Sequence, residues 1–173
     1  MKNKPIEIKK FVYKIEKKKL PNGKIVKIEE VQHNGSVVII AIENKKIILE
    51  RQFRPVINKW IYELPAGTIK KGETPEECAK RELIEETGYF PKNLKRVFFS
   101  YSSPGYSTEI QYFFLATQLK KVKKNLEKYE LIKIKKVSLK EILKLIKDGK
   151  IKDGKTIQGL LFFKSFISKD YKF

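Results

Sequence analysis

Residues 72–89 read GETPEECAKRELIEETGY, and this stretch carries the strongest structural and chemical signal in the chain. Six glutamates fall between Glu73 and Glu86. The 173-residue chain as a whole is strongly basic, with 39 lysine and arginine residues against 20 acidic ones and a formal net charge of +19. A concentration of negative charge in such a protein calls for a specific structural or chemical reason.

The apolar residues of this stretch have helical spacing. Thr74 is placed to act as an N-cap, Pro75 suits the first helical position, and Glu77 completes a capping box. Gly88 is placed to end the helix in a left-handed conformation. We therefore predict a helix from about Pro75 to Thr87.

The glutamates of this helix fall into two groups. Glu76 and Glu77 lie in the first turn, where the helix dipole favours negative charge. Glu82 and Glu86 are four residues apart, so their carboxylates project from one face, with Glu85 at its edge, and repel each other. Glu85 and Glu86 also lie in the last turn, where the dipole disfavours negative charge. The second group therefore needs a compensating cation.

Two interpretations of that cation remain open at this point. Arg81 lies four residues before Glu85 and can pair with it, which leaves a solvated acidic helix face. The alternative is a divalent ion, since Mg²⁺ in proteins is typically held by one or two carboxylates, water and substrate phosphate oxygens. The spacing alone does not choose between them.

Length and composition indicate one ordinary globular domain, with 41% hydrophobic and 34% charged residues. No apolar run approaches the length of a membrane span, so we expect no membrane association. Cys78 is the only cysteine, which excludes an intrachain disulfide and suits a reducing cytoplasm.

The positive charge also suits a nucleic-acid-binding protein. The lysines, however, are spread from Lys2 to Lys172 instead of forming one stripe, which favours a solvated, lysine-coated surface. We therefore expect no nucleic-acid partner and keep RNA as a secondary alternative. Arginine is scarce, and its planar, two-pronged donor suits specific tasks. The chain has only Arg51, Arg54, Arg81 and Arg96.

The remaining pattern predicts a mixed α+β domain, because strands precede and follow the central helix and two further helices end the chain. We expect a break in the strand pattern at PAG, residues 65–67, and further helices over 138–147 and 155–169. The expected strands cover residues 6–19, 24–32, 36–43, 47–53, 60–64, 95–102, 110–117 and 131–137.

One longer motif joins the helix to the segment before it. Gly67 is followed after five residues by Glu73, and after seven more by the run RELIEETGY, from Arg81 to Tyr89. This arrangement resembles an intact Nudix box. The motif fixes nine positions over 23 residues, from Gly67 to Tyr89, and is therefore a specific signal.

The resemblance implies a fold and a domain organisation. The expected fold is α+β: a Nudix α/β/α sandwich, with a mixed β-sheet between helices, and an N-terminal β region. Residues 1–35 would form that N-terminal region, and residues 36–173 would form the Nudix hydrolase domain. Relatives of this type pair through the N-terminal region, so a homodimer is expected.

The resemblance also implies a metal site for Mg²⁺, with Mn²⁺ as a second possibility. Glu82 and Glu86 would be its primary ligands, Glu85 would contribute ligation or water activation, and Ala66 would offer its main-chain carbonyl. Bound metal would neutralise charge on the phosphate oxygens and help to deprotonate a water. Four further residues would shape the segment: Glu73 and Arg81 as braces, and Gly67 and Gly88 as turns.

Features outside the box resemble the ADP-ribose pyrophosphatase group. LPNGKIVKIEEVQHNGSVVIIAI and ILERQFRPVINKWIYELPAG are similar to its N-terminal half, and GKIKDGKTIQGLL is similar to its C-terminal helix. Pro104 lies sixteen residues after Gly88, a spacing associated with ADP-ribose hydrolysis. The implied reaction converts ADP-ribose and water to AMP and ribose 5-phosphate.

The resemblance assigns substrate contacts to five residues. Arg54 and Arg51 would hold the diphosphate, and Glu109 would help to frame the substrate or metal site. Pro104 would belong to the loop that accompanies this specificity. Glu29 lies where the group contacts adenosine, although Ile28 stands where an arginine is common.

Two points stay open from the sequence. The general base could be Glu130, with Glu127 as the fallback, or Glu85 or Glu86. The substrate could be another nucleoside diphosphate sugar such as GDP-mannose, and a less favoured class is RNA-end processing or RNA binding.

Overall fold

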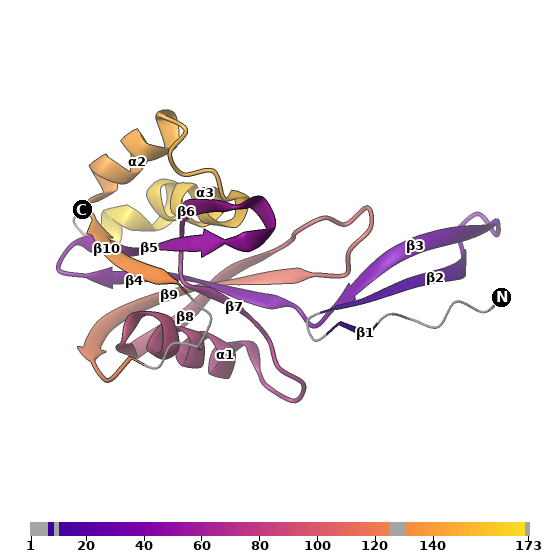
Figure 1. Ribbon diagram of the computed structural model, residues 1–173, viewed down its shortest axis with the longest axis horizontal. Helices are drawn as coiled ribbons and strands as arrows, with labels where there is room; N and C mark the ends of the chain where they lie inside the picture. The colour runs from indigo at the N-terminus through magenta and orange to yellow at the C-terminus, as the bar shows by residue number, and fades with distance from the viewer. Residues whose placement is uncertain (1–6, 9–10, 125–130, 172–173) are drawn as a thin grey trace.

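The computed structural model describes residues 7–8, 11–124 and 131–171, which form two β-sheets. The smaller sheet contains three antiparallel strands: β1 (Glu7–Ile8), β2 (Phe11–Lys19) and β3 (Ile25–His33). The long β2–β3 hairpin projects away from the rest of the molecule (Figure 1). We call this sheet the N-terminal arm.

The larger sheet contains seven strands and forms the centre of the molecule. Its main path runs β10–β5–β4–β9–β8, while β6 pairs with β5 and β7 pairs with β4. The β4–β9 pair is parallel and the other pairs are antiparallel, so the predicted mixed sheet is confirmed. The strands are β4 (Ser36–Glu43), β5 (Lys46–Arg54), β6 (Lys59–Glu63), β7 (Ala66–Thr68), β8 (Tyr89–Tyr101), β9 (Ile110–Lys121) and β10 (Ile132–Val137).

Helices cover both faces of this sheet (Figure 1). On one face lies α1 (Pro75–Glu82), and on the other lie α2 (Leu139–Lys147) and α3 (Gly154–Phe162). The predicted α/β/α sandwich is therefore confirmed.

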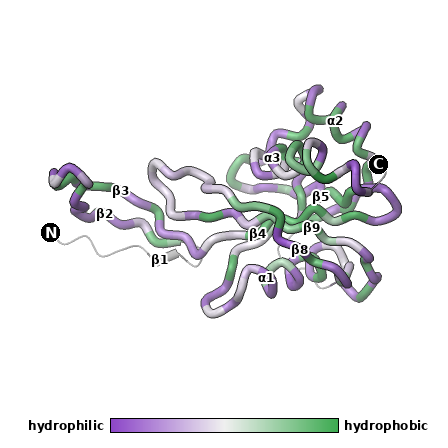
Figure 2. The backbone as a smooth tube through the Cα atoms, turned by 180° about the vertical axis from the view of Figure 1, so that it is seen from behind, coloured by the Kyte–Doolittle hydropathy of each residue, from purple (hydrophilic) through white to green (hydrophobic). Residues whose placement is uncertain are grey.

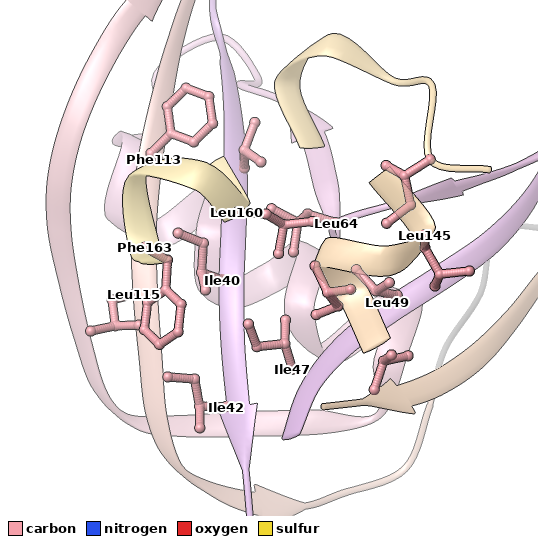
Figure 3. Close-up of a cluster of buried hydrophobic side chains, with 14 residues drawn as sticks. Ile40, Ile42, Ile47, Leu49, Leu64, Phe113, Leu115, Leu145, Leu160 and Phe163 are labelled. Atoms are coloured by element: carbon pink, nitrogen blue, oxygen red, sulfur yellow. The ribbon is translucent and has the colours of Figure 1, made fainter. Parts of the chain in front are cut away.

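The two faces are visible in the alternation of β4, whose side chains point to opposite sides in turn. Val38, Ile40 and Ile42 pack with residues of α2 and α3 in the cluster of Figure 3. Val37 and Ile39 pack against α1 on the other face. Burial on both sides explains why the strand reads as an uninterrupted apolar run.

The acidic helix forms as predicted, with a difference in its last turn. Thr74 accepts from the backbone N–H of Glu77 (3.2 Å), and the Glu77 carboxylate accepts from the backbone N–H of Thr74 (2.9 Å), which confirms the capping box. After α1 the chain continues as a wider π-helical turn, η2 (Leu83–Thr87). Gly88 ends this turn with φ 75°, as expected.

The structure differs from the predicted elements at four places. The predicted break at PAG is wrong in part. Of these three residues only Pro65 lies outside the strands, because β7 begins at Ala66 and pairs with the start of β4. Strand β8 begins at Tyr89, earlier than expected, since it pairs along the length of β9. The last helix is divided into α3, η3 (Phe163–Ile167) and η4 (Ser168–Tyr171). A short 3₁₀ turn, η1 (Pro55–Ile57), was not expected.

Hydropathy separates the arm from the central sheet. Figure 2 shows predominantly hydrophobic residues along the central strands and many hydrophilic residues along the arm and the outer helical turns. Among the described residues, none of the helices has the length and apolar character needed to cross a membrane.

Candidate active site

A cavity of about 790 Å³ opens beside the acidic helix. Its wall is built from β7, the end of α1 with η2, the end of β5, the starts of β4 and β9, and the start of α3. Four of its carboxylates come from residues that the sequence singled out: Glu82, Glu85, Glu86 and Glu109. These four acidic groups lie up to 27 positions apart in the sequence.

Glu82 lies against the backbone of Gly67. A Cβ atom added to Gly67 would stand 2.0 Å from the Glu82 carboxylate carbon, closer than any real contact. Only glycine at this position lets β7 and the helix approach with the carboxylate between them. This contact gives the glycine of the motif a physical role: it makes space for Glu82.

Arg81 is the centre of an ion-pair network. Its Nε and Nη2 donate to the two carboxylate oxygens of Glu73, at 2.7 and 2.9 Å. Its Nη1 donates to Glu82 (2.6 Å) and Glu85 (3.1 Å). The hydrogen bond from Arg81 lowers the pKa of Glu73 to about 2, and the same bond raises the pKa of Arg81. Arg81 and Glu73 thus brace the loop before the helix, as the sequence predicts.

Glu86 is the most deeply buried of these carboxylates, with 3% of its surface exposed. Its Oε2 accepts a hydrogen bond from the backbone N–H of Ala66 at 3.0 Å. Ala66 also lines the cavity. The pair ties the end of the helix to β7 and fixes one carboxylate in the cavity wall.

The donor groups suit a hard divalent cation. Glu82, Glu85, Glu86 and the Ala66 carbonyl supply only oxygen atoms, which is the set that Mg²⁺ and Mn²⁺ prefer. Within the described ranges, no three acidic, histidine or cysteine side chains converge closely enough to hold a metal ion. Arg81 instead balances Glu82 and Glu85. The donor chemistry fits a metal, which would compete with Arg81 for these two carboxylates.

Cys78 lies behind this network and is fully buried. Arg81 Nη2 approaches its sulfur at 3.3 Å. Burial, followed by the charge of Glu73, raises the pKa of the Cys78 thiol to about 12. The thiol is therefore neutral and acts as a packed small residue, as the sequence predicts.

A second charged network faces the cavity from β5, β6 and α3. Arg54 donates to both oxygens of Glu63, from Nε at 2.6 Å and from Nη2 at 2.7 Å. Lys155 donates to Glu63 at 2.5 Å and to Asp153 at 2.9 Å. Arg54, Asp153 and Lys155 line the cavity, while Glu63 lies behind them with 1% of its surface exposed. One buried carboxylate therefore holds two cavity cations.

Burial and ion pairing have opposite effects on the pKa of Glu63. Burial by itself would raise its pKa, but the hydrogen bond from Arg54 and the charge of Lys155 outweigh burial, and the pKa is lowered. The hydrogen bond to Glu63 correspondingly raises the pKa of Arg54. The lowered pKa of Glu63 and the raised pKa of Arg54 both favour the charged forms of this pair at neutral pH.

Sequence reasoning missed Glu63, Asp153 and Lys155. Glu63 directly precedes Leu64 at the end of a short aromatic strand and gives no periodic signal. Asp153 was detectable as an N-cap before a helix, and it does accept from the backbone N–H of Thr156 at 3.0 Å. That Lys155 reaches Glu63, 92 positions earlier, follows only from the packing of α3 against β6.

The two arginines of RQFR lie on opposite faces of β5. Gln52 and Arg54 line the cavity, and Arg51, one residue out of phase, does not. The Arg51 guanidinium instead lies 5.6 Å from the centre of the Trp60 ring. Strand alternation therefore brings only Arg54 of this pair into the site.

Glu109 lines the cavity and Pro104 does not. Glu109 accepts from the hydroxyl of Ser36 at 2.6 Å, which fixes its carboxylate at the start of β4. Pro104 is exposed in the β8–β9 turn. That turn is bonded to the arm, where the N–H of Val31 donates to the carbonyl of Tyr106 at 2.7 Å.

The remaining predicted residues lie away from this cavity or outside the described ranges. Glu29 lies on β3 and accepts from the hydroxyl of Tyr13 at 2.9 Å, and it is not among the cavity residues. Glu127 and Glu130 fall in residues 125–130, outside the residues that the structure describes.

The fold and this cavity agree with the sequence comparison. The sequence model of the NUDIX domain matches residues 32–160, which is most of the chain. The chain belongs to the Nudix family. The Nudix helix and loop are the segment that supplies Gly67, Glu82, Glu85 and Glu86 to the cavity.

Individual Nudix relatives are similar over most of their length. An ADP-ribose pyrophosphatase of Bacillus subtilis (strain 168) is 40% identical over 151 residues, covering 86% of this chain and 82% of the relative. A GDP-mannose pyrophosphatase of Pectobacterium atrosepticum is 35% identical over 164 residues, covering 87% and 83%. A solved structure described as an ADP compounds hydrolase shares the fold, with a TM-score of 0.84, 19% identity, and coverage of 97% and 92%.

Proposed function

We propose that the protein hydrolyses the pyrophosphate bond of ADP-ribose to give AMP and ribose 5-phosphate, with Mg²⁺ as the cofactor and Mn²⁺ as a substitute. The observation that carries this proposal is one cavity in which Glu82, Glu85 and Glu86 face the same space as Arg54 and Lys155. A diphosphate needs both kinds of group: cations for its oxygens and carboxylates for a metal and a water. The name of the Bacillus subtilis relative supports the choice of ADP-ribose.

The positions of the cavity residues suggest separate roles in diphosphate binding and metal binding. Arg54 and Lys155, held by Glu63, would bind the diphosphate oxygens, and Glu109 would frame the opposite side. Glu82 and Glu86, with the Ala66 carbonyl, would hold the metal. When bound, a divalent cation neutralises charge on the phosphate oxygens and makes a nearby water more acidic.

Glu85 is the best placed of the three helix carboxylates to accept a proton from the attacking water. Its side chain is 24% exposed, compared with 13% for Glu82, while Glu86 is committed to Ala66. Its bond to Arg81 is also longer than that of Glu82, at 3.1 against 2.6 Å. We propose Glu85 as the base, with Glu86 and Glu130 as alternatives.

We further propose that residues 1–35 mediate a homodimer and contact the adenosine half through Glu29, with residues 36–173 as the hydrolase domain. Support comes from the arm, whose exposed residues include Phe11, Tyr13, Ile15 and Ile25, the last 68% exposed. Apolar groups on a projecting hairpin favour burial against a second subunit. We place the protein in the cytoplasm, where its single cysteine stays reduced.

A second candidate substrate is GDP-mannose. It is favoured by the relative from Pectobacterium atrosepticum, which is named a GDP-mannose pyrophosphatase. The same cavity groups would serve, because the diphosphate is common to both substrates. Discrimination between ADP-ribose and GDP-mannose would then depend on contacts with the nucleobase and the terminal sugar.

The test is a substrate panel assayed with and without Mg²⁺. We expect AMP release from ADP-ribose at a higher kcat/KM than hydrolysis of GDP-mannose, other nucleotide sugars or capped RNA, and no turnover in excess chelator. A preference for GDP-mannose would support the second candidate. Metal-dependent cleavage of capped RNA in preference to all nucleotide sugars would overturn both.

A further inference from the structure

Two lysines at the edge of the cavity have no role in the proposed reaction. Lys70 and Lys71 lie in the loop between β7 and α1, line the cavity and are exposed. We propose that they form an anion site for a phosphomonoester that the substrate carries outside its diphosphate. This inference rests on the proposed function, and it predicts that the enzyme prefers substrates that carry an additional phosphate.

Few of the many lysines of the described residues line the cavity. Of the lysines in the described residues, only Lys70, Lys71 and Lys155 line it. Lys155 is balanced by Glu63 and Asp153. In the described ranges neither Lys70 nor Lys71 takes part in an ion pair, so both ammonium groups are available to an anionic ligand at the edge of the cavity.

The loop that carries these lysines is held by its backbone. The N–H of Lys70 donates to Glu73 Oε2 at 2.9 Å, and the N–H of Glu73 donates to the carbonyl of Lys70 at 3.0 Å. The N–H of the preceding Ile69 donates to the carbonyl of Gly35 at 3.1 Å. The loop position is thus fixed while both side chains remain free to bind a ligand.

The two sets of cations come from different elements of the cavity wall: Arg54 and Lys155 from β5 and α3, and Lys70 and Lys71 from the loop between β7 and α1. In Figure 1 the β5–β6 hairpin, with Arg54 at the end of β5, lies on one side of β7, and the loop into α1 lies on the other. The carboxylates of Glu82, Glu85 and Glu86 line the same cavity from the helix. A diphosphate bound by Arg54 and the metal would leave Lys70 and Lys71 to a different anionic group of the same ligand.

A phosphomonoester suits this second site. It is close to doubly charged at neutral pH and presents three acceptor oxygens, which two flexible ammonium groups can share. The substrate class is therefore an ADP-ribose with one additional phosphate. The phosphate could belong to the adenosine half or to the terminal ribose, and the two sources are separable by experiment.

The experiment compares three ligands: ADP-ribose, ADP-ribose 2′-phosphate and ADP-ribose 1″-phosphate. The variant combines Lys70→Gln with Lys71→Gln. Its control combines Lys140→Gln with Lys147→Gln on α2, both exposed and outside the cavity, and lowers the net charge equally. Dissociation constants come from titration calorimetry in EDTA at low salt, and kcat/KM is measured with Mg²⁺.

We expect one phosphorylated ligand to bind the wild-type protein about tenfold more tightly than ADP-ribose, as two partly exposed ion pairs allow. The advantage should be lost in the Lys70/Lys71 variant, persist in the control, and decline with added salt. A gain for the 2′-phosphate would assign the site to the adenosine half, and a gain for the 1″-phosphate to the ribose half.

The inference is overturned if neither phosphorylated ligand binds more tightly than ADP-ribose, or if the advantage survives in the Lys70/Lys71 variant. Normal turnover of ADP-ribose with either result would leave the proposed function intact. Absence of any turnover with Mg²⁺ would instead contradict the proposed function, while the binding ratios measured in EDTA would still decide the inference.

Discussion

Arg54 and Glu63 form an ion pair with two hydrogen bonds, in which the Glu63 carboxylate is buried and the Arg54 guanidinium lines the cavity. The two N–O distances are 2.6 and 2.7 Å, Glu63 is 1% exposed, and the Arg54 side chain is 39% exposed. The pair engages Nε and Nη2 of the guanidinium, which leaves Nη1 for a ligand. Glu63 therefore orients the Arg54 guanidinium at the cavity wall without lining the cavity itself.

Glu63→Gln should weaken substrate binding more than it slows the chemical step. The amide can no longer hold two cations, so Arg54 and Lys155 lose their fixed positions. We expect KM for ADP-ribose to rise about tenfold with a smaller change in kcat, and the free energy of unfolding to fall by about 2–4 kcal/mol. Steady-state kinetics and urea unfolding measure the two effects.

A matched control for Glu63→Gln is Glu141→Gln. Glu141 pairs with Lys135 at 2.8 Å, but both side chains are more than 40% exposed and lie outside the cavity. An exposed pair contributes little, so KM and stability should stay within error of the wild type. Equal effects of the two substitutions would contradict the role assigned to Glu63.

The two arginines of β5 should differ in their effect on substrate binding. Arg54→Gln removes a cavity cation, and we expect KM to rise by about 10- to 100-fold, as loss of a charged hydrogen bond implies. Arg51→Gln should leave KM unchanged, because Arg51 packs on Trp60 outside the cavity. A comparable rise in KM for Arg51→Gln would show that the substrate reaches the other face of the strand.

Gly67→Ala should reduce activity far more than stability. The three atoms nearest to the new methyl group belong to the flexible end of Glu82, which can move away, so we expect the free energy of unfolding to fall by less than about 1 kcal/mol. The displaced carboxylate should lower kcat/KM by about 100-fold. Gly105→Ala is the control, since a Cβ there has nothing within 4 Å. A fully active Gly67→Ala variant would show that the position of Glu82 does not matter for catalysis.

Glu86→Gln should abolish metal-dependent turnover while preserving the fold. The amide oxygen can still accept from the N–H of Ala66, so circular dichroism and the unfolding midpoint should change little. The lost negative charge should lower kcat by at least about 100-fold at saturating Mg²⁺. Glu76→Gln, at the exposed start of the same helix, should remain active. Retained activity in Glu86→Gln would refute the proposed metal ligands.

The low pKa of Glu73 predicts a pH dependence of stability. The folded-state pKa of about 2 lies below the ordinary 4.5, so the ion pair with Arg81 stabilises the protein fully above pH 4.5 and less as the pH falls toward 2. Glu73→Gln should be less stable than the wild type at pH 7. Urea unfolding at several pH values should show this difference shrinking below pH 4.5, and a constant difference would contradict the prediction.

Local sequence rules predicted the helix because its signals are local. Thr74, Pro75, Glu77 and Gly88 act within one or two turns of their own position, and each has the predicted conformation. The apolar runs likewise identified the buried strands, although the pairing that extends β8 back to Tyr89 depends on β9. The wider π turn at Leu83–Thr87 had no sequence signal.

The sequence by itself determined the family and the group of carboxylates on the helix, because the spacing from Gly67 to Gly88 is a local code for one loop and one helix. Only the tertiary structure decided which other residues join them. Strand alternation turned Arg54 into the cavity and Arg51 away from it, and the packing of α3 brought Lys155 to Glu63. Contacts between distant segments depend on the register of whole strands and helices, which no short stretch of sequence specifies.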